Sequence, residues 1–143
     1  MPKSTSLSNS LLNLIFQGTA ITGLATNATT SPNTSLYVAL HTANPGVGGS
    51  QTTSEAAYTG YARVAVARTS AGWSTATAGS TSPVAAISFP AATAGTETET
   101  YFSIGTAASG AGVVLYSGAI SPSIAVANGV QPQLTTGTLI SEA

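Results

Sequence analysis

Side chains able to do acid–base chemistry are scarce in this chain of 143 residues. It holds one histidine, His41, and four acidic residues, all glutamates, among many serines. Any Ser-His-Glu triad would need His41 as its base. No Gly-x-Ser-x-Gly turn is present to place a serine as nucleophile. We therefore expect no catalytic residue, and we interpret His41 as a strand-end histidine that hydrogen-bonds its neighbours.

Glu97 and Glu99 form a second candidate, because residues two apart on a strand share a face. Glycoside hydrolases use two carboxyl groups about 5 to 10 Å apart, but no aromatic cluster accompanies this pair. We interpret it as a solvated strand edge that discourages aggregation. One histidine and scattered glutamates give no metal-ligand spacing, and residues 46–49 lack the Lys-Ser/Thr of a phosphate loop. We expect neither a metal nor a cofactor.

The remaining charges gather around one predicted strand. Arg63 and Arg68 bracket an alternating apolar pattern over residues 62–67, and Glu55 lies just upstream. Only 5% of the residues are charged. We therefore expect Glu55, Arg63 and Arg68 to form a structural ion pair or cluster.

Aromatic residues suggest a site of another kind. All five tyrosines lie in or beside predicted strands, and the single tryptophan, Trp73, follows a turn. Two interpretations stay open: the rings cover core edges, or Tyr58, Tyr61 and Trp73 anchor an interface with another protein.

Composition favours a protein that works through its surfaces. Hydrophobic residues make up 43%, the net charge is −1 and cysteine is absent. A surface of Ser, Thr, Ala and Gly is easier to desolvate than a charged one. Three basic residues are too few for a phosphate backbone, so we expect no nucleic-acid partner. We also expect no membrane span, because no apolar run reaches 18 residues, and no small-molecule substrate.

Residues 4–17 carry the one helical pattern, with Leu7, Leu11, Leu14 and Ile15 on a single apolar stripe. This stripe must dock, either on the chain's own β domain or on a neighbouring subunit. We therefore predict an N-terminal helix or arm over residues 1–20 and a single β-sandwich domain over residues 21–143.

Alternating or apolar runs predict strands at residues 35–43, 62–69, 84–89, 98–106, 113–119, 124–127 and 133–140. Turn signals recur about every ten residues, as in sandwiches, and no helix-length segment separates the strands. The predicted fold is all-β: a β-sandwich or jelly roll of about seven or eight short antiparallel strands.

The segments LYVALHTANPG (36–46) and YTGYARVAV (58–66) resemble a widespread family of small tailed-phage and prophage virion proteins. ISFPAAT (87–93), YFSIGT (101–106) and VVLYSGA (113–119) extend the resemblance over most of the chain. It implies a virion component, with no catalytic residue to carry over, and there is also a likeness to jelly-roll cement proteins of phage heads.

The function we expect from residues and resemblance together is a non-enzymatic capsid cement or decoration protein. Its partners would be the major capsid protein and copies of itself, and it would be made in the host cytoplasm and located in the virion. The alternative is a tail or tail-fibre component that binds a host receptor, although no heptads or shaft repeats are visible. A lectin-like module is a third hypothesis.

Overall fold

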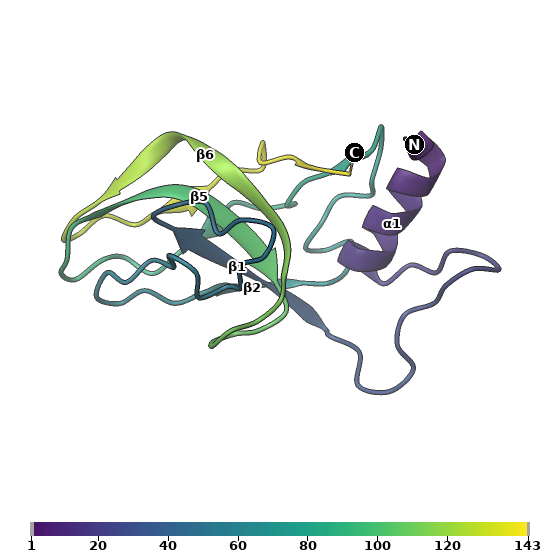
Figure 1. Cartoon of the computed structure of the whole chain (residues 1–143), viewed down its shortest axis with the longest axis horizontal. Helices are drawn as coiled ribbons and strands as arrows, with labels where there is room; N and C mark the ends of the chain where they lie inside the picture. The colour runs from purple at the N-terminus through teal and green to yellow at the C-terminus, as the bar shows by residue number, and fades with distance from the viewer. Residues whose placement is uncertain (1, 143) are drawn as a thin grey trace. The chain divides into compact units, whose positions relative to one another are not determined.

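The computed structural model describes residues 2–142, and over this range the chain is mostly β with one N-terminal helix (Figure 1). The elements are α1 (Thr5–Gln17), β1 (Ser35–His41), β2 (Val64–Ala67), β3 (Ser80–Thr81), β4 (Ile87–Ser88), β5 (Glu97–Gly105), β6 (Val114–Val126), β7 (Gln133–Leu134) and β8 (Ile140–Ser141). The strands form a four-stranded sheet in the order β2-β1-β5-β6 and two small pairs, β3-β8 and β4-β7. The predicted all-β class with a short helix is confirmed.

The chain forms two compact units. The helix unit contains the residues up to Ser35, Val66–Ala86 and the residues from Leu134 on. The sheet unit contains Leu36–Ala65 and Ile87–Gln133, and therefore most of the four-stranded sheet. The N-terminal helix thus shares its unit with segments far along the chain.

Residues 38–41 of β1 are all buried, so both faces of this part of the strand are covered. Leu36, Val38 and Leu40 alternate on one face as predicted, and all three are buried. On the other side, the fully buried Gln51 donates its amide to the carbonyl of Tyr37 and accepts a hydrogen bond from the backbone N–H of Ala107. One glutamine therefore ties two loops to the strand.

β6 is one long strand where the sequence predicts two short ones. The predicted strands 113–119 and 124–127 leave out Ser121-Pro122, since proline cannot donate to a ladder. In the structure, Ala119 pairs with Tyr101 and Ile124 with Glu99, so residues 120–123 of β6 bulge away opposite Thr100 alone. Pro122 lies in this bulge, where no ladder hydrogen bond is required of it. The expected last strand is likewise divided, into β7 and β8, and β3 was not predicted.

Helix α1 begins and ends as its sequence dictates. The Ser4 side chain accepts a hydrogen bond from the backbone N–H of Leu7, which caps the first turn. Gly18 ends the helix at φ 70°, a left-handed conformation that glycine adopts readily.

The face of α1 that docks is not the predicted one. Its buried residues are Ser8, Leu12 and Phe16, at i, i+4 and i+8. The predicted stripe of Leu7, Leu11, Leu14 and Ile15 stays partly accessible, and Leu7 is 38% exposed. Two polar contacts hold the helix in this orientation. The Asn13 side chain accepts a hydrogen bond from the N–H of Ala76, and the Asn9 side chain accepts one from the N–H of Gly79.

Trp73 lies inside the helix unit. Its side chain is fully buried and meets the ring of Phe16 edge-on, with ring centroids 4.7 Å apart. The Gln17 side chain donates to the Trp73 carbonyl at 3.0 Å. The prediction of Trp73 as an interface anchor is therefore wrong, because its ring packs under the chain's own helix.

Candidate functional site

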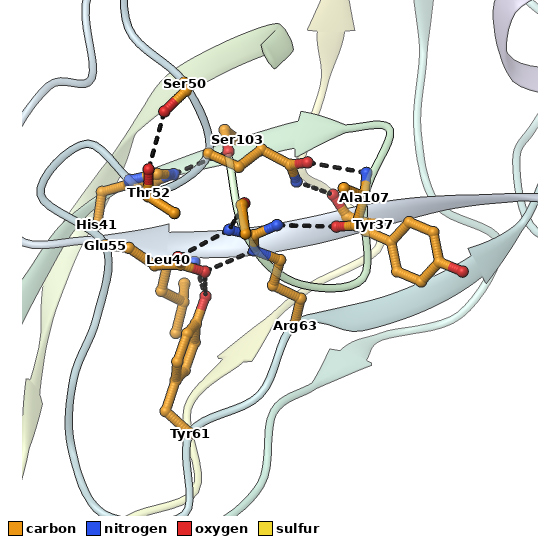
Figure 2. A network of polar contacts seen from close by, with 12 residues as sticks. Tyr37, Leu40, His41, Ser50, Thr52, Glu55, Tyr61, Arg63, Ser103 and Ala107 are labelled. Carbon is orange, nitrogen blue, oxygen red and sulfur yellow. Dashed lines mark hydrogen bonds and ion pairs between the residues drawn. The ribbon is translucent and has the colours of Figure 1, made fainter. Parts of the chain in front are cut away.

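The densest polar cluster of the sheet unit is centred on Glu55 and Arg63 (Figure 2). Hydrogen bonds from Thr42 to Ser54 and from Ala56 to Leu40 hold the Glu55 backbone beside β1. Arg63 binds the carboxylate with two nitrogens, Nε at 2.6 Å from Oε1 and an Nη at 2.8 Å from Oε2. Such a fork-like pair is among the stronger charge-assisted contacts in proteins.

Arg63 also joins this pair to a distant loop. Its remaining guanidinium N–H groups donate to the carbonyls of Ala107 at 2.9 Å and Gly110 at 2.7 Å. Its side chain is 2% exposed, against 17% for that of Glu55. The hydrogen bonds to Glu55 raise the pKa of Arg63, so the guanidinium stays charged. The cation therefore fixes the loop between β5 and β6.

Tyr61 belongs to the same cluster and links β1 to Glu55. Its hydroxyl accepts a hydrogen bond from the Leu40 N–H at 3.1 Å and donates one to Glu55 at 3.0 Å. Its ring stacks on Phe89, with centroids 6.4 Å apart. Burial raises the pKa of Tyr61 above its usual range. Tyr61 therefore stays protonated, and its hydroxyl satisfies the Leu40 N–H of β1.

Tyr58 is also internal. It is buried, it donates its hydroxyl hydrogen to the Pro90 carbonyl at 2.9 Å, and its ring meets that of Tyr61 edge-on. Burial raises the pKa of Tyr58 to about 12. The interface interpretation does not describe Tyr58 or Tyr61, because both rings pack within the sheet unit and both hydroxyls are engaged there.

A surface hollow of about 290 Å³ opens over this cluster, lined by Glu55, Ala56, Tyr61, Ala62, Arg63, Ala108, Ser109 and Gly110. The charged groups on its wall already bind one another and the loop carbonyls. The hollow therefore offers a ligand few unsatisfied partners.

His41 forms a dyad with Ser103 that resembles catalytic chemistry. Its Nε2 lies 2.8 Å from the Ser103 hydroxyl and its Nδ1 lies 2.9 Å from the Thr53 carbonyl. A carbonyl only accepts, so Nδ1 carries the proton and Nε2 accepts from the serine. Burial lowers the pKa of His41 and favours this neutral form. Both side chains are fully buried, out of reach of a substrate, and they tie the loop at Thr53 to β1 and β5.

Glu97 and Glu99 have unlike environments. One oxygen of Glu97 accepts hydrogen bonds from the N–H groups of Ala57 and Tyr58, both at 2.8 Å. Glu99 is fully buried, and within residues 2–142 no donor reaches its carboxyl oxygens. Burial, reinforced by the nearby Glu97 carboxylate, raises the pKa of Glu99 to about 8. The neutral, protonated form of Glu99 is therefore favoured in the folded chain.

The interpretation of this pair as a solvated edge is therefore wrong for Glu99. Glu99 pairs with Ile124 of β6, and its side chain is fully buried although it is the third residue of β5. This burial carries no signal in the sequence, because alternation along a strand does not tell which of its two faces other parts of the chain cover.

A pH titration of stability tests the neutral state of Glu99. Raising the pKa from 4.5 to about 8 means that the folded chain holds a proton which the unfolded chain loses. Stability should therefore fall as pH rises from about 4.5 to about 8 and then level off. Glu99→Gln, which keeps the shape of the side chain but cannot ionise, should remove this fall and raise the melting temperature above wild type at pH 8. Glu142→Gln is the control, and a wild-type slope in Glu99→Gln would contradict the assignment.

Arg68 does not join the Glu55 cluster in the way the sequence suggests. It donates to the carbonyls of Leu14 and Ile15 at 2.6 and 2.5 Å, and to the Asn27 side chain at 2.6 Å. A cation at these carbonyls complements the negative end of the α1 dipole. Arg68 is thus a cap for the helix, whereas the structure places only Arg63 on Glu55.

Among the described residues, no group of three or more His, Cys, Asp or Glu side chains is placed to hold a metal ion. Within the same range, no helix is long and apolar enough to cross a membrane. The polar clusters instead link loops to strands, as in a β-rich structural protein.

Comparison with known families agrees with this class. The chain matches the family described as podophage GP4 fiber I protein gp80 over residues 2–142. It therefore belongs to this family of phage structural fibre proteins, and the resemblance to tailed-phage virion proteins is confirmed. No curated protein matches the chain.

Proposed function

We propose that this chain is a structural subunit of a virion fibre in a tailed phage and acts by association rather than by chemical reaction. The observation that carries the proposal is the family match over nearly the whole chain. It favours the fibre alternative over the capsid cement role that composition first suggested. Copies of this chain and neighbouring virion proteins would be its partners.

The structure supports an associating role in two ways. The groups that could do chemistry, His41, Ser103 and the Glu55–Arg63 pair, are engaged in internal hydrogen bonds. The few charges leave a surface of small polar and apolar side chains, which is inexpensive to desolvate on contact. Such a surface suits permanent contacts in an assembled particle.

Electron microscopy of purified virions labelled with a gold-conjugated antibody against this chain tests the proposal. A fibre subunit should place gold on appendages that project from the particle. Gold spread evenly over the head would contradict the fibre role and restore the cement role. Virions of a phage lacking the gene are the control for antibody specificity.

A further inference from the structure

The four-stranded sheet ends in the short strand β2 on one side and in the long strand β6 on the other. On the β2 side, the Leu40 N–H of β1 donates to the Tyr61 hydroxyl and the Leu40 carbonyl accepts from the Ala56 N–H. At the other end of the order, β6 pairs with β5, and no further strand among residues 2–142 pairs with it. Every second residue of β6 therefore directs its N–H and C=O away from the sheet.

This open edge is long and carries no charge. β6 spans 13 residues and lies along the outer rim of the sheet in Figure 1. Between Glu99 and Glu142 the sequence contains no Asp, Glu, Lys, Arg or His. Folded proteins commonly protect such edges with lysines or other charges, because a bare edge recruits further strands. Residues 114–119 lack that protection apart from a one-residue register shift at Leu115, and the proline and the longer bulge come afterwards.

Side chains at the start of the edge are also unusually accessible and apolar. Val113 is 62% exposed and Leu115 36%, while Ser117 and Ala119, on the same face as Leu115, are exposed and small. On the inward face, Gly118 leaves room for the Phe102 ring, since a Cβ there would lie 2.9 Å from it. At Val113 the backbone already bridges to Ser50. The outward side chains of Leu115, Ser117 and Ala119 are the exposed ones that a partner can meet.

We propose that residues 114–119 of β6 pair, antiparallel, with the same segment of a second copy of this chain. The inference rests on the proposed function, which requires contacts between copies. A second copy fits because the segment has no charge, so identical strands can lie side by side without a like-charge pair. The paired strands join two sheets by backbone hydrogen bonds, the mode known as strand addition.

Sedimentation of the full-length chain with one added charge tests this contact. Ser117→Lys places two lysines close together across the pair, and we expect the dissociation constant for self-association to rise by about tenfold or more. Val47→Lys adds the same charge on a fully exposed loop and should leave it unchanged. A monomeric wild type, or an equal effect of both variants, would overturn the proposal. Circular dichroism checks that each variant folds.

Cross-linking gives a second, independent test, because the natural chain has no cysteine. Ser117→Cys, in the middle of the exposed row, should form disulfide-linked dimers on mild oxidation at least tenfold faster than Val47→Cys. In an antiparallel pair centred there, residue 115 of one copy lies opposite residue 119 of the other, so Leu115→Cys and Ala119→Cys should cross-link faster when mixed than either variant does alone. Uniformly slow cross-linking would overturn the pairing. Virion labelling separates the proposed function from the strand pairing. Gold on fibres without a β6 cross-link would support the fibre role and overturn the pairing. A β6 cross-link in a chain that is absent from fibres would support the pairing and overturn the fibre role.

Discussion

Glu55→Ala is expected to lower the free energy of unfolding by about 3 kcal/mol or more. The substitution leaves the guanidinium of Arg63, which is 2% exposed, without its counter-charge. It also removes the acceptor of the Tyr61 hydroxyl and weakens the hold of Arg63 on the loop at Ala107. Chemical denaturation followed by tryptophan fluorescence or circular dichroism measures the change.

The matched control is Glu142→Ala, which removes another glutamate from an ion pair. The Lys3–Glu142 pair has a 2.8 Å contact, but its side chains are 32% and 21% exposed. Exposed pairs contribute about 0 to 1 kcal/mol, so this variant should remain close to wild type. Equal losses in both variants would show that the Glu55–Arg63 pair is not a special anchor. Replacing both Glu55 and Arg63 by leucine should recover part of the loss, because no buried charge is then left unpaired.

Phe16→Ala is expected to cost about 3 to 5 kcal/mol, the usual range for a buried aromatic residue. The ring is fully buried and packs edge-on against Trp73, so its removal opens a cavity between α1 and the segment that carries Trp73. Trp73 is the single tryptophan, so its emission should also shift to longer wavelength as water enters.

Leu7→Ala is the control on the same helix, because Leu7 is 38% exposed. It should cost less than about 1 kcal/mol. A larger loss from Leu7→Ala than from Phe16→Ala would mean that the leucine stripe predicted from sequence, rather than the face with Phe16, is the docking surface.

The elements themselves could largely be read from the sequence. Hydroxyl residues at positions 4–6 and Gly18 indicate the ends of the helix, of which Ser4 is the actual N-cap, and alternation identifies β1, β5 and most of β6. The docking face of α1 could not be read, because hydrophobic periodicity ignores what Asn9 and Asn13 bind. Their backbone partners, at Gly79 and Ala76, lie more than 60 residues away in the chain.

Pairing of charges could be predicted only in part. Glu55 and Arg63 are close in sequence, and the structure brings them together. Arg68 follows Arg63 closely in the chain, yet it does not bind Glu55. Its partners are the carbonyls at the end of α1, which carry no signal in the sequence. Burial of Glu99 was likewise unpredictable, because it depends on β6 lying beside β5.

The central claim is that the chain is a fibre subunit of a tailed-phage virion, and its copy number in purified particles tests this most directly. Quantitative mass spectrometry with isotope-labelled peptides can compare this chain with the major capsid protein of the same particles. A fibre subunit should be present in a handful to a few dozen copies per virion. Hundreds of copies, equal to or a simple fraction of the capsid protein, would contradict the claim and identify a protein that covers the head.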